Sequence, residues 1–295
     1  MDISGTIVPM ATPIDGDGID EAALEEFTRS LVDGGVHGLF PGSSIGEFPS
    51  LTADQHCTLV ETVVEAADDS TTVIAGCCAT SIGDVRARIS TAAAAGADAA
   101  VVVTPYYLST TQDGLRRFFE RVAADSPLEL LLYNIPALTG NELAVDTVFR
   151  LADLEAVVGL KDTSGDLGYQ HRILEGTPPE FSVFQGSTDI AAAALNLGAD
   201  GLIAGPANVF PDELAELYEA HARGDDATVN RIFREVVVPL VSTYDDIPTA
   251  AAIKHLLRRD GHDVGDPLPP VAPVSAAEAE RLDAAYRTVV DRRTG

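Results

Sequence analysis

The sequence predicts a (β/α)8 barrel followed by a C-terminal helical appendage. Within residues 5–222, eight short apolar runs alternate with helical segments, and each run is apolar throughout. Continuous apolar runs are typical of parallel strands covered by helices, and eight such units match a closed barrel better than an open sheet. No G-x-G-x-x-G follows a strand and no G-x-x-x-x-G-K-[ST] loop is present, which disfavours an open nucleotide-binding sheet. We therefore expect a barrel at residues 1–222 and a helical region at 223–295.

The predicted strands are residues 5–11, 36–41, 72–75, 99–103, 128–133, 157–161, 181–185 and 201–204. The predicted helices are residues 20–33, 52–67, 81–95, 112–124, 144–151, 166–174, 189–197, 211–222, 225–244, 248–259 and 275–292. Asp20 and Thr52 are suitable N-cap residues for the first two helices. Residues 12–18 are predicted as a turn and the proline-rich residues 267–273 as a rigid connector.

Composition limits the classes of partner. The formal net charge of -27 argues against nucleic acid and anionic membrane surfaces, although a locally positive pocket could still bind a small anion. The 46 acidic residues are scattered along the chain, lysine occurs only twice and tryptophan is absent, which favours an acidic surface in a salt-rich cytoplasm over an ordinary acidic protein. No apolar run approaches the ~20 residues that span a bilayer, and the first residues lack the basic region of a signal peptide. We expect a cytoplasmic protein.

Neither cysteine nor histidine spacing indicates a metal site. Cys57, Cys77 and Cys78 are three in number and lack ligand spacing, so we interpret them as reduced, buried residues. The six histidines are dispersed, and none has a carboxylate or a second histidine at the sequence spacing of metal ligands. No metal and no cofactor are therefore predicted.

Lys161 is the candidate reactive group. It ends the apolar run 156–160, directly before a polar turn, so it should stand at the carboxyl end of a parallel strand, where barrel enzymes have their active sites. Arginine supplies nearly every other positive charge, and Lys254 is the only other lysine. A guanidinium stays protonated, whereas a lysine amine can lose its proton and form a Schiff base with a carbonyl. The alternative is a strand-end lysine whose ammonium group lies in solvent.

Tyrosines and a serine loop are expected on the same rim. Tyr133, Tyr106 and Tyr107 each follow an apolar strand, which favours proton transfer over the commoner role of filling space with one hydrogen bond. Ser43 and Ser44 lie between two glycines after the second strand. Such a loop either binds a carboxylate through its backbone N–H groups and hydroxyls or simply leads into the next helix.

These residues resemble the pyruvate-dependent class I aldolases of the dihydrodipicolinate synthase and N-acetylneuraminate lyase superfamily. The similarity covers nearly the whole chain and includes Gly5-Thr6, Tyr133-Asn134-Ile135-Pro136, Gly159-Leu160-Lys161 and Gly198-Ala199-Asp200-Gly201. The resemblance implies that Lys161 forms a Schiff base with a 2-keto acid, that Tyr133 shuttles the proton and that Ser43 and Ser44 hold the carboxylate. It also implies a homotetramer in which Tyr107 is lent to a neighbouring site.

Departures from the family pattern bear on the substrate. Ile45 stands where relatives carry a second loop threonine, and Leu138 replaces an arginine that binds the aldehyde's carboxylate in dihydrodipicolinate synthases. The strand-end loops place Thr163, Gly186 and Ser187 as further substrate contacts, but they lack some polar groups that sialic-acid lyases use.

The sequence therefore looks most like a haloarchaeal aldolase for 2-keto-3-deoxygluconate or its 6-phosphate. Such an enzyme would serve an Entner-Doudoroff type of sugar-acid degradation. The competing interpretations are 4-hydroxy-tetrahydrodipicolinate synthase, N-acetylneuraminate lyase and a non-catalytic keto-acid sensor.

Overall fold

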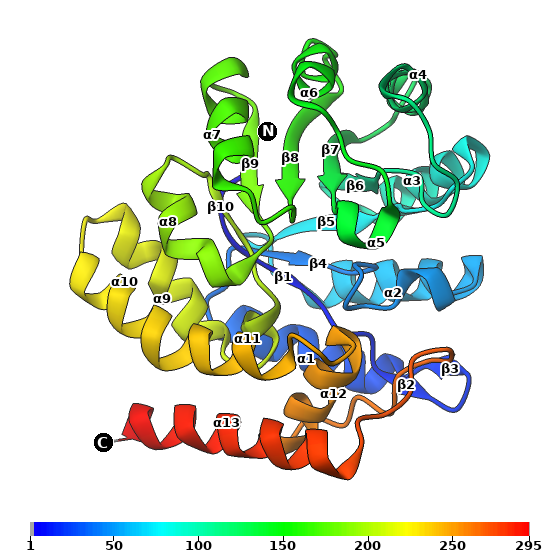
Figure 1. The fold of residues 1–295 in the computed structure, drawn as a ribbon. Coiled ribbons are helices and arrows are strands. Elements are labelled where there is room, and N and C mark those ends of the chain that lie inside the picture. The colour runs from blue at the N-terminus through cyan, green and yellow to red at the C-terminus, as the bar shows by residue number, and fades with distance from the viewer. Residues whose placement is uncertain (1–2, 295) are drawn as a thin grey trace.

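The computed structural model describes residues 3–294 and contains a closed barrel of eight parallel strands. The barrel order is β1-β10-β9-β8-β7-β6-β5-β4, so neighbours in sequence are neighbours in the barrel. The strands are β1 (Gly5–Pro9), β4 (Gly38–Phe40), β5 (Thr72–Gly76), β6 (Ala99–Val103), β7 (Glu129–Asn134), β8 (Val157–Asp162), β9 (Ser182–Gln185) and β10 (Gly201–Ile203). The predicted fold class is confirmed (Figure 1).

Helices form a layer outside the barrel. These are α1 (Glu21–Asp33), α2 (Ala53–Ala66), α3 (Ile82–Ala95), α4 (Gln112–Ala123), α6 (Val145–Ala152), α7 (Leu167–Gly176), α8 (Ala191–Asn196) and α9 (Pro211–Ala222), with a short α5 (Pro136–Thr139) after β7. Asp20, Thr52, Ser81, Thr111 and Asp166 each accept a backbone N–H at a helix start. These caps explain why the helices begin where the sequence predicts.

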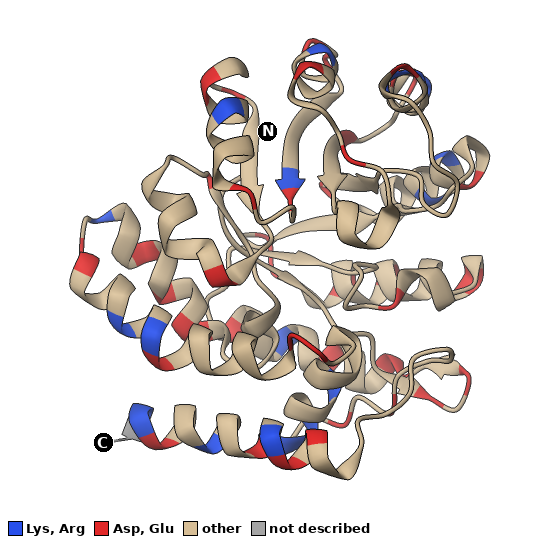
Figure 2. Ribbon diagram, viewed as in Figure 1, with Lys and Arg blue, Asp and Glu red and all other residues tan. Residues whose placement is uncertain are grey.

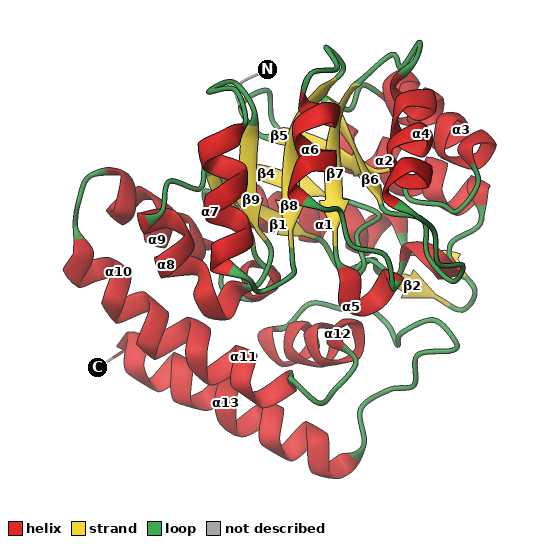
Figure 3. Cartoon of the chain, turned by 45° about the horizontal axis from the view of Figure 1, so that its top comes forward, coloured by secondary structure: helices red, strands yellow, loops and turns green. Residues whose placement is uncertain are grey.

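The C-terminal region is helical, as predicted. It contains α10 (Asp226–Ile232), α11 (Val238–Tyr244), α12 (Thr249–Asp260) and α13 (Ala276–Thr294). Figure 3 shows α5 and α12 beyond the carboxyl ends of β7 and β8. Part of the region therefore lies over the end of the barrel that is expected to carry the active site. The division into two domains at residue 222 stays a prediction.

Two local predictions differ from the structure. Residues 12–18, predicted as a turn, contain most of a small hairpin of β2 (Ile14–Asp15) and β3 (Gly18–Ile19). Each strand has only two residues, too few for an alternating pattern to appear in the sequence. The predicted helix 225–244 contains a π-helical segment at Phe233–Val237 between α10 and α11.

Two apolar layers build the core. One lies between the sheet and the helices, and the other fills the barrel with Ile7, Phe40, Leu131, Phe184 and neighbouring side chains. Tyr133 belongs to the inner layer and pairs in register with Lys161 on the adjacent strand. The inner layer therefore forms the floor beneath the upper ends of β7 and β8.

Candidate active site

Lys161 lies inside the barrel against aromatic rings. Lys161 is 4% exposed, and its Nζ lies 4.0 Å from the ring centroid of Tyr133 and 5.1 Å from that of Phe40. Within residues 3–294, Nζ makes no ion pair and no hydrogen bond. Because no carboxylate holds this amine, nothing in the described chain competes with a carbonyl substrate for it.

A pocket of about 520 Å³ opens above Lys161. Its walls come from the strand ends and from the connection between α11 and α12. The lining residues are Pro9, Ser44, Ile45, Tyr133, Ile135, Leu138, Lys161, Thr163, Gly186, Ile203, Gly205, Asp245, Ile247, Pro248, Thr249, Ala250 and Val271. This volume suits a small organic acid or a short sugar acid.

The loop after β4 presents one of its two serines to the pocket. Ser44 lines the pocket, and its Oγ lies 3.5 Å from the Tyr133 hydroxyl, a long contact for a hydrogen bond. The Ser43 hydroxyl instead accepts the Gly46 N–H at 3.1 Å, and the residue is 1% exposed. The Ser43 side chain therefore stabilises the loop and is not among the residues that line the pocket, and its contact with substrate stays a prediction.

Thr163 and Gly186 complete the wall beside Lys161. The Thr163 hydroxyl is buried and has no hydrogen-bond partner among the described residues. A Cβ atom at Gly186 would lie 2.1 Å from that hydroxyl oxygen and 3.0 Å from Lys161 Cε. Only glycine therefore fits at position 186, and the unpaired hydroxyl is available to a ligand. Ser187, also predicted to contact substrate, is not among the lining residues.

Neither of the two tyrosines after β6 lines the pocket above Lys161. Tyr107 is 93% exposed and adopts a left-handed backbone conformation, with φ of 75°. Tyr106 packs edge-on against Phe48, with ring centroids 6.0 Å apart. A role for Tyr107 at the site would need a second copy of the chain.

A buried polar network supports the ends of β7 and β8. Asn134 donates through Nδ2 to Asp162 Oδ1 at 2.8 Å, and the Ser164 hydroxyl donates to Asp162 Oδ2 at 2.7 Å. Burial raises the pKa of the Asp162 carboxyl, while these donors act in the opposite direction. Asn134, Asp162 and Ser164 each directly follow a predicted site residue in the sequence. Their hydrogen bonds join two strands, and no pattern in the sequence predicts such contacts.

Histidines form pairs with carboxylates in the structure, and one cysteine differs from its prediction. His37, directly before β4, lies 2.9 Å from Glu219 on α9, and His255 on α12 lies 2.9 Å from Asp283 on α13, because the fold brings segments distant in sequence together. Even so, no group of three or more His, Cys, Asp or Glu side chains within residues 3–294 is placed to hold a metal ion. The cysteines are free thiols, but Cys57 is only partly buried.

A (β/α)8 barrel with a buried lysine and a tyrosine at its strand ends suits Schiff-base chemistry, and the family that the chain matches places it among the carbon–carbon lyases. The chain belongs to the dihydrodipicolinate synthetase family, whose family model matches residues 2–288.

Among relatives, the chain is 32% identical to 4-hydroxy-tetrahydrodipicolinate synthase 1 of Halalkalibacterium halodurans, over 97% of each protein. It is 34% identical to a DapA-like lyase of Halobacterium salinarum, covering 89% of this chain and 86% of the relative. The crystal structure of Escherichia coli YagE in complex with pyruvate superposes with a TM-score of 0.92 at 29% identity. The match covers 97% of this chain and 98% of YagE.

Charge is spread over the helices, and acidic segments predominate (Figure 2). No helix in the part of the chain that the structure describes is both long and apolar enough to span a bilayer.

Proposed function

We propose that the protein is a Schiff-base aldolase that cleaves a 2-keto-3-deoxy sugar acid, 2-keto-3-deoxygluconate, to pyruvate and glyceraldehyde. The observation that carries this proposal is the Lys161 amine, which is buried against the Tyr133 ring and has no ion-pair partner among the described residues. The pocket above it is large enough for a six-carbon acid.

The proposed chemistry uses two side chains. The amine of Lys161 adds to C2 of the keto acid, and the hydroxyl of the adduct leaves as water with a proton from Tyr133, which gives a protonated imine. Tyr133 then takes the proton of the C4 hydroxyl, the C3–C4 bond breaks, and its electron pair moves into an enamine as the aldehyde departs. Protonation of C3 and hydrolysis of the imine release pyruvate and restore Lys161.

The loop after β4 would hold the substrate carboxylate. Ser44 lies beside the Tyr133 hydroxyl and lines the pocket, so a carboxylate bound there would place C2 near Lys161. Thr163 adds an unpaired hydroxyl to the pocket wall. Gly186 leaves room for this arrangement.

The outer wall favours an uncharged aldehyde. Among the described residues that line the pocket, Lys161 is the only cation and Asp245 the only carboxylate. Leu138 is 67% exposed at the pocket and offers no charge to a carboxylated or phosphorylated aldehyde. Asp245 and Thr249 can instead bind the hydroxyls of a short polyol. This favours the free acid over its 6-phosphate.

The relatives' names support a second candidate, condensation of pyruvate with aspartate semialdehyde. Against it stands Leu138, because the carboxylate of that aldehyde would find no cation at this wall. Cleavage of sialic acid and non-catalytic sensing of a keto acid are weaker candidates, since no contact in the pocket favours either of them.

Two measurements test the proposal. Borohydride added with pyruvate should leave a covalent adduct on Lys161, and peptide mass spectrometry locates it. An adduct on Lys254, or no adduct, would contradict the mechanism. Comparison of kcat/KM for 2-keto-3-deoxygluconate, its 6-phosphate, sialic acid and the condensation then decides the substrate. A tenfold preference for either of the last two, about 1.4 kcal/mol, would refute the substrate assignment. A sensor would bind pyruvate and turn over none of the four.

The proposal also covers the oligomeric state of the protein, its cellular environment and the kind of pathway that it serves. We propose a homotetramer in which a second copy brings Tyr107 to the site, since this side chain is exposed and does not line the pocket of its own chain. We also propose that the acidic surface serves a salt-rich cytoplasm and that the reaction belongs to an Entner-Doudoroff type of sugar-acid breakdown.

A further inference from the structure

A buried ion pair joins the loop after β4 to the C-terminal helices. Glu47 ends that loop, and its Oε2 lies 2.7 Å from Nζ of Lys254 on α12. The side chains are 2% and 0% exposed, respectively. Burying two charges is costly unless further polar contacts satisfy them, so the surroundings of this pair are informative.

Both charged groups make a second contact with the segment that follows α12. Glu47 Oε1 accepts the Leu268 N–H at 2.6 Å, and Lys254 Nζ donates to the Asp266 carbonyl at 3.0 Å. Desolvation lowers the pKa of Lys254, and Glu47 opposes this effect. The pair therefore ties the loop to two parts of the C-terminal region at once.

Each side of the pair is connected to a segment that lines the pocket. On one side, the Glu47 N–H donates to the carbonyl of Ser44, which lines the pocket, at 3.2 Å. Glu47 also has a left-handed backbone, with φ of 59°, a conformation that costs energy in a residue other than glycine. On the other side, α12 begins at Thr249, which lines the pocket together with Ala250.

Neither Glu47 nor Lys254 lines the pocket itself. They are therefore positioning residues and not catalytic ones. We propose that the Glu47–Lys254 ion pair fixes the loop that carries Ser44 relative to α12, so that binding of the keto-acid carboxylate depends on the docked C-terminal helices. This inference rests on the proposed function, because it assumes that the loop binds a carboxylate.

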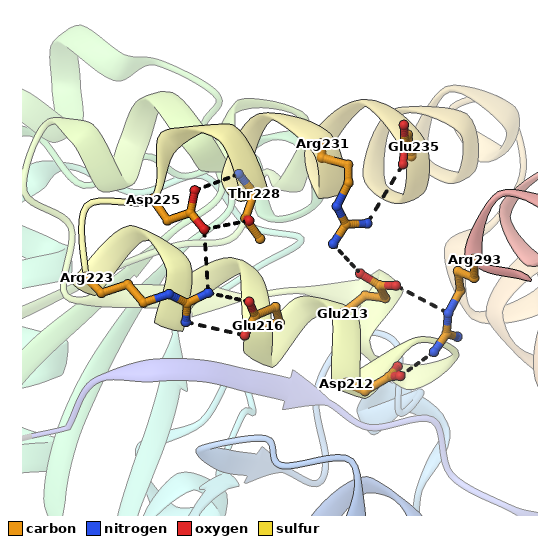
Figure 4. Close-up of polar contacts among 9 residues, drawn as sticks. All are labelled: Asp212, Glu213, Glu216, Arg223, Asp225, Thr228, Arg231, Glu235 and Arg293. Atoms are coloured by element: carbon orange, nitrogen blue, oxygen red, sulfur yellow. Dashed lines mark hydrogen bonds and ion pairs between the residues drawn. The ribbon is translucent and has the colours of Figure 1, made fainter. Parts of the chain in front are cut away.

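Three variants and one control test the inference. Glu47→Gln removes the charge and keeps an acceptor for Leu268, and Lys254→Met keeps the length of the side chain. The double variant leaves no unpaired buried charge and guards against loss of the fold. Arg293→Met is the control, because Arg293 ties the end of α13 to Asp212 and Glu213 on α9 through partly exposed ion pairs outside the pocket (Figure 4).

The first readout is the pyruvate concentration that gives half-maximal borohydride trapping on Lys161. We expect an increase of at least tenfold in both single variants and in the double variant, with a smaller change in trapping at saturation. The control should match the wild type. Half-saturation within twofold of the wild type in the folded double variant would overturn the inference, as would an equal increase in the control.

The second readout needs no substrate. Amide hydrogen exchange in residues 42–47 should become faster in Lys254→Met and in the double variant, but not in Arg293→Met. Unchanged exchange would overturn the positioning role even if the wild type traps pyruvate. Conversely, a wild type that traps no pyruvate would refute the proposed function, while hydrogen exchange would still decide whether the ion pair orders the loop.

Discussion

Replacement of Gly186 by alanine should disable the site while the barrel stays folded. The new Cβ would lie 2.1 Å from Thr163 Oγ1, whereas ordinary contact begins at 3.4 Å. It would also lie 3.0 Å from Lys161 Cε and 3.2 Å from the Asp162 carbonyl oxygen. Gly186 does not have a positive φ, so the substitution adds contact and no backbone strain.

The size of the effect follows from the shortfall of about 1.3 Å between 2.1 Å and 3.4 Å. Thr163 cannot withdraw with its backbone, because its N–H donates to the Asn134 carbonyl at 2.8 Å on the next strand. The Thr163 hydroxyl oxygen must therefore move out of its place in the pocket wall by about 1 Å, and Lys161 Cε must also give way by about 0.4 Å to return from 3.0 Å to 3.4 Å. A misplacement of this size costs about 10²-fold in rate, about 2.7 kcal/mol of transition-state stabilisation.

The assay is kcat/KM for the proposed cleavage together with the melting temperature. Gly83→Ala on α3 is the matched control, since the nearest atom to its added Cβ is the Ser81 hydroxyl oxygen at 3.9 Å. The control should retain activity. If Gly186→Ala retains kcat/KM within threefold of the wild type, Lys161 does not act from its position between Thr163 and the Tyr133 ring.

Three further predictions concern specificity, salt and pH. Leu138→Arg should raise the ratio of kcat/KM for the 6-phosphate to that for the free acid at least tenfold, and an unchanged ratio would show that this wall does not select the aldehyde. With a net charge of -27, the melting temperature should rise from dilute buffer to molar potassium chloride, and a flat response would refute the halophilic interpretation. Burial lowers the pKa of His56 from 6.5 to about 4, so below pH 6.5 the unfolded state binds more protons. The free energy of unfolding, measured in urea, should therefore fall by about 2 kcal/mol between pH 7.5 and pH 5. The variant His56→Gln should lose less stability over the same range, and an equal loss would exclude His56 as the cause.

The sequence located the strand ends well because apolar runs stop where polar motifs begin. Lys161 and Tyr133 were each expected at the top of a strand, and the parallel register places them side by side. The barrel order requires neighbouring strands to pair, so adjacency in sequence became adjacency in space. The positions of Lys161 and Tyr133 could therefore be predicted from the apolar runs and the order of the strands alone.

The outer wall of the pocket could not be predicted in the same way. Asp245 and Thr249 lie more than 80 residues beyond Lys161 in the chain, and only the packing of α11 and α12 brings them to the pocket. The direction of the Ser43 hydroxyl was equally hidden, since a serine in a tight loop can bond either to a ligand or to the loop itself.

The two lysines show how environment divides the roles of identical side chains. Both are at least 96% buried, but Lys254 has a carboxylate at 2.7 Å, whereas the described residues around Lys161 offer aromatic ring faces and no carboxylate. An ammonium paired with Glu47 would have to break that pair and expose the carboxylate to an apolar interior before it could act as a nucleophile. The Lys161 amine has no such partner to lose. The attack that we propose for Lys161, and not for Lys254, is therefore favoured by where the chain places Glu47 as much as by the pocket itself.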